Sequence, residues 1–466
     1  MNIPTILAVL TTLRQLRKRE HWTHEQLAAH QAQALGQLRE YVYEHAPFYQ
    51  RFHRGLMDRP LHELPVLTKT MMMEHFDDLV TDRAIHLEDI RAHMATLGDD
   101  QHYLDRYWIT ATSGSTGQPG IFLFNRAEWA TVIASFARGQ EWGGLKVDLR
   151  HRRKMAMVSS TASLHMSSRV GMTVQSPWIS TLRLATVEPL PSIVQQLNDF
   201  QPDILVAYAS MARILAEEQH AGRLDIKPTV IFTSSEVLTE ETRRRVEDAW
   251  GKVLFNEYAA TESGGLAAER IDHRGLYLFE DLVIFEVVDA DNRPIPPGVY
   301  GDKVLLTALF KRTQPLIRYE LHDSVRLGSG SPLSDLPFAL IDGIQGRTED
   351  ILYLPGIAGG AIAVHPTVFH QVMDTVPTNG WQVLQGEDGL TLLLSGLREA
   401  FEDEALVSQL RNALTRQGIV VPSIAVQRVA AIPKGAGGKA PLIKSNHTPV
   451  PTIENPLPDS HEEGLS

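Results

Sequence analysis

Short apolar segments alternate with helical segments between residues 204 and 255. Residues 204–208, 230–233 and 253–255 are apolar runs of strand length, and helical stretches separate them, the second running from Thr239 to Trp250. Strand, helix, strand, helix, strand in close succession is typical of parallel strands joined by crossover helices. The chain is therefore predicted to be an α/β protein whose mostly parallel sheet is flanked by helices.

Polar residues follow two of these strands. They form the clusters Ser234-Ser235-Glu236 and Tyr258-Ala259-Ala260-Thr261-Glu262. In open parallel sheets, ligands bind beyond the carboxyl ends of the strands. We therefore expect both clusters to face one crevice.

A third polar segment, Thr112-Ser113-Gly114-Ser115-Thr116-Gly117-Gln118-Pro119, is suited to holding a polyphosphate. Its glycines let the main chain turn tightly and bring N–H groups close to phosphate oxygens, and its hydroxyls can donate further hydrogen bonds. A plain surface turn is the alternative reading. The segment lacks the lysine that follows the second glycine of the common P-loop, so a cation for the phosphates must come from elsewhere in the chain.

The first hundred residues have a helical pattern. Met72, Phe76 and Leu79 share one helical face, and Thr68 is a candidate for the start of that helix. Residues 283–327 instead alternate and are interrupted by prolines, which indicates hairpins or a small barrel.

A smaller unit is expected after Gly346. Leu406, Leu410 and Leu414 form a helical stripe, and residues 423–432 have the pattern of a strand. The tail 447–466 is rich in Pro, Glu, Asp and Ser, so we expect it to be disordered.

Composition excludes several functional classes. The formal net charge of −12 over 466 residues argues against a general nucleic-acid binder, because a phosphate backbone would be repelled. The chain contains no cysteine, which excludes disulfides, thiol nucleophiles and cysteine-ligated zinc. The apolar run near the N-terminus is too short to span a bilayer, so we expect no membrane span.

Four further motifs follow the Gly/Ser/Thr segment in a recognisable order. They are Tyr258–Glu262, Arg318–Asp323, Gly346–Asp350 and Gly437–Lys439. In this order the motifs resemble the adenylate-forming superfamily of acyl-coenzyme A synthetases, peptide-synthetase adenylation domains and luciferases. Within it, the early segments Leu38–Tyr41, Pro47–Tyr49 and Leu64–Lys69 look like the N-terminal signature of the phenylacetate-coenzyme A ligase-like branch.

The resemblance implies two domains. Residues 1–346 would form an N-terminal adenylation core, which binds ATP and the acid and includes a small β subdomain. Residues 347–446 would form a small, mobile α+β domain. Glu349 corresponds to the hinge of the family, where Asp or Lys is usual, and a pivot there would bring the C-terminal domain to the site and remove it again.

The resemblance also assigns roles around the triphosphate. Thr112, Ser113, Gly114, Ser115, Thr116 and Gly117 would hold the phosphates. Glu262 would hold Mg²⁺, since a hard dication prefers anionic oxygen ligands, and Thr261 would contact a phosphate oxygen. An ordinary helix cap is the alternative for Thr261 and Glu262.

The nucleoside would be bound by other motifs. Tyr258 would lie against the adenine, with a core aromatic as the alternative. Asp323 would accept hydrogen bonds from the ribose hydroxyls. Arg347 would place a permanent charge near the ribose and α-phosphate, although it could instead pair with the nearby Asp350. Ser235 and Glu236 correspond to a segment that passes close to the adenine, which is less glycine-rich here than is usual.

Lys439 is the residue that the resemblance implies for the first chemical step. Its ammonium would stabilise charge that builds on the phosphoryl oxygens and on the departing pyrophosphate. Lys444 and a solvated linker lysine are the alternatives. His165 is a candidate for contacting the acyl carboxylate, with a structural histidine as the alternative.

The implied activity is that of an AMP-forming ligase. With ATP and Mg²⁺ it would convert a small carboxylic acid into an acyl-AMP, release pyrophosphate, and pass the activated acyl group on. Coenzyme A is the expected acceptor, and a carrier-protein phosphopantetheine or an amine is the alternative. Further alternatives are an enzyme that adenylylates a deazaflavin and stops, and a non-catalytic nucleotide-binding homologue. We expect a cytoplasmic protein. The sequence leaves the oligomeric state open, and a homodimer is one option because related proteins of this branch often look dimeric.

Overall fold

The computed structural model describes most of residues 3–445. The positions outside the description are 1–2, 97–101, 113–118, 146–151, 177, 187, 330–334, 348–351, 358, 365, 374–375, 377, 387–388, 398–400, 422, 434–442 and 446–466. The predicted disordered tail therefore lies outside the described residues.

Helices fill the N-terminal hundred residues, as predicted. The Thr68 hydroxyl accepts a hydrogen bond from the Met71 N–H and so caps a helix, but this helix is interrupted at His75, whose ring packs against Phe48. The apolar stripe is buried as expected, but it spans two short helices. The bounds are α1 Ile3–Arg19, α2 His24–His45, α3 Pro47–Phe52, a 3₁₀ turn Leu61–Glu63, α4 Lys69–Glu74, α5 Phe76–Leu79 and α6 Leu87–Thr96.

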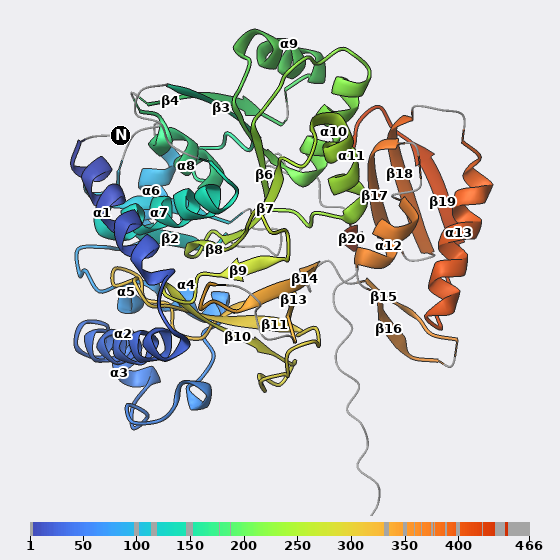
Figure 1. Ribbon diagram of the computed structural model, residues 1–466. Helices are drawn as coiled ribbons and strands as arrows, with labels where there is room; N and C mark the ends of the chain where they lie inside the picture. The colour runs from blue at the N-terminus through green and yellow to red at the C-terminus, as the bar shows by residue number, and fades with distance from the viewer. Residues whose placement is uncertain are drawn as a thin grey trace, which may run out of the picture.

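A nine-stranded sheet forms the centre of the molecule, with the order β13-β14-β9-β8-β7-β6-β5-β3-β4 (Figure 1). The strands from β4 to β7 are parallel neighbours, and the remaining pairs are antiparallel. The predicted parallel α/β arrangement is confirmed. The strand bounds are β3 Arg153–Ser159, β4 Ile179–Ala185, β5 Ile204–Tyr208, β6 Val230–Ser234, β7 Leu254–Ala260, β8 Gly264–Glu269, β9 Leu276–Leu278, β13 Asp323–Leu327 and β14 Leu340–Arg347.

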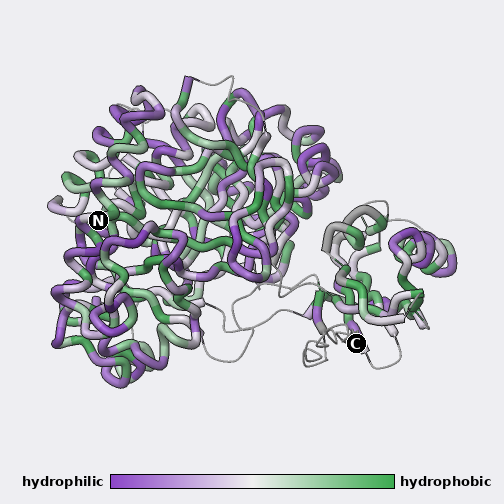
Figure 2. The backbone as a smooth tube through the Cα atoms, turned by 90° about the horizontal axis from the view of Figure 1, so that it is seen from below, coloured by the Kyte–Doolittle hydropathy of each residue, from purple (hydrophilic) through white to green (hydrophobic). Residues whose placement is uncertain are grey.

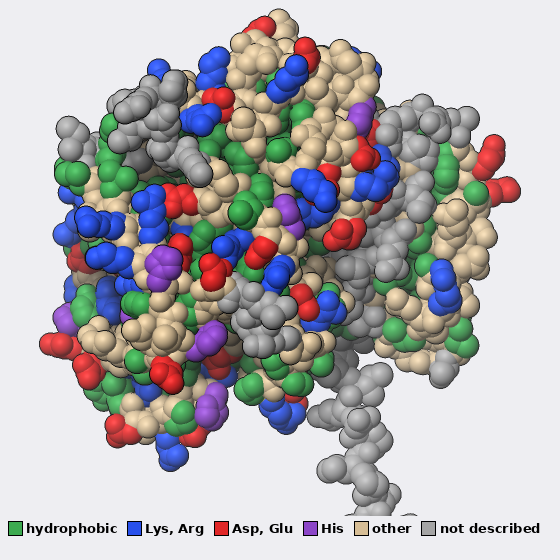
Figure 3. Space-filling model, in the orientation of Figure 1, with side chains coloured by type: hydrophobic (Ala, Val, Ile, Leu, Met, Phe, Trp, Pro, Cys, Tyr) green, Lys and Arg blue, Asp and Glu red, His purple; other side chains and the backbone are tan. Residues whose placement is uncertain are grey.

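Crossover helices connect the parallel strands. The Thr239 hydroxyl accepts from the Thr242 N–H at 3.1 Å and caps α11, and Gly251, with φ +82°, ends it. Acidic and basic side chains alternate over α10 and α11, as Figure 3 shows, and include the pair Arg244–Glu241 at 2.8 Å. The helix bounds are α7 Arg126–Trp142, α8 Met166–Val174, α9 Leu190–Phe200, α10 Ala209–His220 and α11 Glu240–Trp250.

Two smaller sheets complete the N-terminal part. β1 (Trp108–Ala111) and β2 (Ile121–Phe124) pair antiparallel on either side of the Gly/Ser/Thr segment. β10 (Val283–Val288), β11 (Lys303–Ala308) and β12 (Tyr319–Leu321) form an antiparallel sheet, which confirms the hairpins predicted there.

Residues after β14 pack around a hydrophobic cluster of their own. Figure 2 shows this part beside the rest of the molecule. The predicted helical stripe is buried in α13, whereas the last predicted strand is shorter than expected and ends at Arg428. The bounds are β15 Leu352–Pro355, β16 Ala361–Val364, α12 Pro366–Met373, β17 Thr378–Gly386, β18 Gly389–Leu397, α13 Asp403–Arg416, β19 Ser423–Arg428 and β20 Ile443–Ser445.

None of the helices in the described part of the chain combines the length and the apolar character that a membrane crossing requires.

Candidate active site

The Gly/Ser/Thr segment is held at its base by the strands that flank it. The Thr112 N–H donates to the Gly120 carbonyl at 3.0 Å, and the Gly120 N–H donates to the Thr112 hydroxyl at 2.8 Å. Ser113, Gly114, Ser115, Thr116 and Gly117 lie outside the described residues. These two hydrogen bonds hold the two ends of the segment next to each other, at the ends of β1 and β2.

His165 lies beside this base. It stands at the N-cap of α8, and the carbonyl of the preceding Leu164 accepts a hydrogen bond from the Ala111 N–H at 2.9 Å. The chain around His165 therefore runs directly past the end of β1, where the Gly/Ser/Thr segment begins. Its predicted contact with an acyl carboxylate stays a prediction.

Tyr258 and Asp323 meet across the sheet. The Tyr258 hydroxyl, on β7, donates to Oδ2 of Asp323, the first residue of β13, at 2.6 Å. The edge of the Tyr258 ring also faces Phe285, with the ring centres 6.2 Å apart. The hydrogen bond occupies one carboxylate oxygen and sets the direction of the other, so two residues that the sequence places 65 positions apart form one unit.

Arg347 is the partner of Asp323 in the register of β13 and β14. The main chain of the two residues therefore lies side by side, and the side chain of Arg347 lies outside the description. Glu349 and Lys439 also lie outside the described residues, whereas Lys444 is an exposed residue of β20.

The turn Thr261-Glu262 follows β7 and is tied down through both of its carbonyl groups. The Thr110 hydroxyl donates to the Thr261 carbonyl at 3.3 Å, and Nζ of Lys311 donates to the Glu262 carbonyl at 3.1 Å. Glu262 is only 8% exposed. Because Thr110 lies two residues before Thr112, these contacts bring the predicted metal ligand to the base of the Gly/Ser/Thr segment.

Ser235 and Glu236 follow β6, as the sequence predicts. Ser235 has φ +70°, in the left-handed region where glycine carries no steric penalty. Glu236 accepts a hydrogen bond from the Ser210 N–H at 2.9 Å, in the first turn of α10. The Glu236 carboxylate thus has a structural partner, and its predicted place near the adenine stays a prediction.

Glu257 precedes Tyr258 and was not singled out from the sequence. Its carboxyl is buried against Gly139 of α7, and within the described residues its Oε1 has no hydrogen-bond partner. Burial raises the pKa of the Glu257 carboxyl to about 8, so the group is mostly protonated at neutral pH.

Known proteins with similar sequences include phenylacetate-coenzyme A ligases. The chain is 27% identical over 373 residues to that of Thermus thermophilus, with 76% of each chain covered. It is 30% identical over 261 residues to that of Pseudomonas putida, which covers 53% of this chain and 56% of the relative. No family model matches the chain.

Solved structures agree on the fold. A crystal structure of 2-hydroxyisobutyryl-CoA ligase in the postadenylation state superposes with a TM-score of 0.70 at 19% identity, and covers 92% of this chain and 91% of that chain. The structure of the same enzyme in the thioesterification state gives 0.59. The chain is thus similar in sequence to phenylacetate-coenzyme A ligases and shares the fold of 2-hydroxyisobutyryl-CoA ligase.

Lys311 was not singled out from the sequence. The side chain is fully buried, and its ammonium lies 4.0 Å from the centre of the Phe124 ring. Burial lowers the pKa of Lys311 to about 8, while Glu128 and Glu262 act in the opposite direction. The signal in the sequence was a lysine directly after the apolar strand that precedes Arg318–Asp323.

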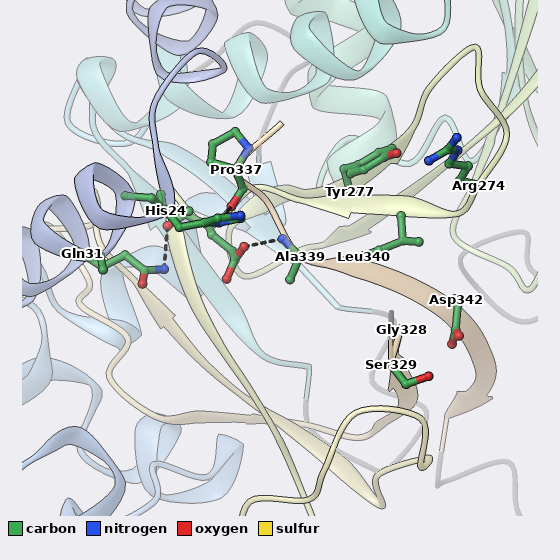
Figure 4. Close-up of a pocket in the computed structure, with 13 residues that line it drawn as sticks. His24, Gln31, Arg274, Tyr277, Gly328, Ser329, Pro337, Ala339, Leu340 and Asp342 are labelled. Atoms are coloured by element: carbon green, nitrogen blue, oxygen red, sulfur yellow. Dashed lines mark hydrogen bonds between the residues drawn. The ribbon is translucent and has the colours of Figure 1, made fainter. Parts of the chain in front are cut away.

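A cavity of about 610 Å³ lies apart from the predicted site. Figure 4 shows it between α2 and the strands β9 and β14, where His24, Tyr277 and Asp342 line it. No residue that the sequence singled out lines this cavity. The predicted site is identified by converging polar contacts and not by this cavity.

Proposed function

We propose that the protein is an AMP-forming acid–thiol ligase. It activates a small carboxylic acid with ATP to an acyl-AMP, releases pyrophosphate, and transfers the acyl group to coenzyme A. Two steps are needed because a carboxylate is a poor electrophile, whereas a mixed anhydride with AMP as leaving group is a good one.

The observation that carries the proposal is the convergence of three units at the end of the parallel strands. Three units from distant parts of the chain meet around β1 and β7. They are the start of the Gly/Ser/Thr segment at Thr112, the Thr261-Glu262 turn and the Tyr258–Asp323 pair. A carboxylate held by a tyrosine hydroxyl suits the two vicinal hydroxyls of a ribose. The arrangement supports a nucleotide whose phosphates point toward the Gly/Ser/Thr segment.

Mg²⁺ fits the donor set of this site. Glu262 offers an anionic oxygen, which a hard dication prefers. Elsewhere in the described ranges, no group of three or more His, Asp or Glu residues gathers that could hold a metal alone. We propose that Glu262 holds the ion together with the phosphates of ATP, and the ion would supply charge neutralisation on the triphosphate when bound.

Lys439 is proposed to supply the cation for adenylation from the C-terminal part, with Glu349 as the hinge. Lys439→Ala should then abolish adenylation and leave acyl transfer from supplied acyl-AMP largely intact. Rates of the two half-reactions, measured separately, check this. Equal losses in both would exclude the role.

The activity itself is tested by exchange of labelled pyrophosphate into ATP, across a panel of aromatic and aliphatic acids. We expect labelled pyrophosphate to exchange into ATP only when both Mg²⁺ and one class of acid are present. ATP binding without exchange for any acid would instead favour the non-catalytic alternative. A carboxylate attached to an aromatic or apolar group is the substrate class to try first, because the relatives are phenylacetate-coenzyme A ligases.

The acceptor is tested by mass spectrometry of the products, with coenzyme A, a carrier protein and amines offered in parallel. We expect the coenzyme A thioester. An acyl carrier protein or an amide as the main product would move the enzyme to one of the alternatives. A cytoplasmic location and a homodimer stay predictions, which fractionation and sedimentation would check.

A further inference from the structure

Lys311 is a lysine whose whole side chain is inside the protein. It lies in the connection between β11 and β12 and has no exposed surface. Lysine is rarely buried completely, because the ammonium loses its hydration, unless specific partners replace the water. The partners of this ammonium therefore indicate what the residue does.

These partners come from two elements of the candidate active site. Nζ donates to the main-chain carbonyl of Glu262 at 3.1 Å. It also lies 4.0 Å from the centre of the Phe124 ring and 5.6 Å from that of Phe122, both on β2. Because β2 begins where the Gly/Ser/Thr segment ends, one ammonium links the root of that segment to the Thr261-Glu262 turn.

The residues after Lys311 fasten this connection to α7 and to β2. Glu128 Oε1 accepts from the main-chain N–H groups of Arg312 and Thr313, at 2.6 and 2.7 Å. The Gln314 side chain accepts from the N–H of Leu123 at 2.9 Å and donates to the Ile121 carbonyl at 3.0 Å, both on β2. We call residues 311–314 the brace.

A second hydrogen bond to the Thr261-Glu262 turn comes from β1, the strand that precedes the Gly/Ser/Thr segment. The Thr110 hydroxyl, on β1, donates to the Thr261 carbonyl at 3.3 Å. The two carbonyls of the turn are thus held by one side chain from β1 and one from the brace. Fixing the main chain in this way sets the positions from which the side chains of Thr261 and Glu262 extend.

We infer that Lys311 is a positioning residue for MgATP, because its buried ammonium fixes the Glu262 main chain against the root of the Gly/Ser/Thr segment. The inference rests on the proposed function, since it assigns Glu262 to the metal.

A methionine of similar length would preserve the packing against the rings. It would, however, leave the Glu262 carbonyl without its donor inside the protein.

The test compares Lys311→Met with the wild type in two measurements. In calorimetry with MgATP and no acid, we expect the Kd to rise about tenfold, the effect typical of losing a hydrogen bond to a charged group. In turnover, the KM for ATP should rise similarly, while the KM for the acid stays within about twofold of the wild-type value. A merely structural defect would not separate the two KM values.

Lys303→Met is the matched control. Lys303 lies on β11 and is mostly buried, and it pairs with Glu320 at 2.8 Å, away from the turn. This variant should bind MgATP as the wild type does. A folded Lys311→Met protein with an unchanged Kd for MgATP would overturn the inference.

Thr110→Val keeps the inference testable if Lys311→Met does not fold. It removes the other tie to the turn without changing the side-chain shape, and we expect a smaller rise of the same Kd. An unchanged Kd in that variant would contradict the two-sided fixing of the turn. If the wild type binds MgATP but exchanges no pyrophosphate with any acid, the proposed function fails and the binding comparison still decides the role of Lys311.

Discussion

The Tyr258 hydroxyl does more in this site than its ring alone would do. It donates to Asp323 at 2.6 Å and so orients the carboxylate that is proposed to bind the ribose. Tyr258→Phe keeps the ring for the adenine and removes this orientation. We expect the Kd for ATP to rise about three- to tenfold, as for the loss of one hydrogen bond, measured by calorimetry.

Tyr277→Phe is the control for that measurement. Its hydroxyl donates to Asp272 at 2.9 Å, so the change also removes a tyrosine–aspartate hydrogen bond, but on β9 beside the cavity of Figure 4. It should leave ATP affinity unchanged. Equal effects of the two substitutions would contradict the assignment of Asp323.

Glu257 predicts a pH dependence of stability. Its pKa is about 8 in the folded protein, above the ordinary value of 4.5, so the folded state holds this proton more tightly than the unfolded state does. The stabilising contribution is therefore complete below pH 4.5 and is lost as the pH rises through 8. The free energy of unfolding of Glu257→Gln should equal that of the wild type at low pH, where both side chains are neutral. At about pH 9 the variant should be more stable by a few kcal/mol.

Urea denaturation of both proteins across this range measures the difference. A constant difference in the free energy of unfolding from acidic to alkaline pH would show that the carboxyl is not protonated in the fold. Protonation would also explain why a carboxyl without a partner at Oε1 is tolerated next to the candidate site.

Single residues show where sequence analysis of the site succeeds and where it ends. Thr112, Thr261, Glu262 and Asp323 stand in ordered motifs, and such motifs reveal which residues share a site. Lys311 has no motif of its own, because its role depends on a contact with a carbonyl 49 positions away. Contacts of that kind follow from tertiary packing, which periodicity and spacing do not encode.

At the scale of elements, α7 is fastened to the sheet region by a buried ion pair. Arg138 of α7 and Asp281 are both fully buried, 2.9 Å apart, and the guanidinium lies 4.0 Å from the centre of the Phe279 ring. Arg138→Met leaves Asp281 with the weaker contact to Arg19 at 3.5 Å. We expect a loss of about 3 kcal/mol in the free energy of unfolding by urea.

Arg244→Ala is the matched change on a surface helix. Arg244 is 62% exposed and pairs with Glu241 and Asp248 on α11. Removing it should cost less than about 1 kcal/mol, because water screens exposed pairs. If both substitutions lowered the free energy of unfolding by similar amounts, the buried ion pair would not be what holds α7 in place.

Elements were predictable where several local signals coincided. For α11, the Thr239 cap, the acidic first turn and the glycine stop all mark one helix, and its bounds agree. Between Lys69 and Leu79 the apolar period alone predicted one helix, but the chain leaves helical geometry at His75, whose ring lies against Phe48. The bounds of an element therefore depend on neighbours as well as on its own residues.

At the scale of the whole molecule, a buried hydrogen bond joins the C-terminal unit after β14 to the rest of the described structure. The Arg213 guanidinium, on α10, donates to the Thr378 carbonyl at the start of β17 at 2.9 Å, and both residues are buried. Loss of this bond should loosen the C-terminal unit. In Arg213→Met we expect a broader distribution of distances between spin labels on Gln195→Cys of α9 and Ser408→Cys of α13.

The labels are specific because the chain has no cysteine of its own. Arg223→Met is the control, since Arg223 lies just beyond α10 and pairs with Glu218 at the surface. It should leave the distance distribution as in the wild type. Identical distributions for Arg213→Met and the wild type would contradict a restraining role for this contact.

The protein as a whole is proposed to couple activation of an acid to cleavage of ATP at the α-phosphate. The most direct test is to identify the nucleotide and phosphate products of turnover with a substrate acid and coenzyme A. We expect AMP and pyrophosphate, each formed in the same amount as the thioester, and we expect their formation to require the acid. ADP and orthophosphate formed with the thioester, or thioester formed without consumption of ATP, would contradict this proposal.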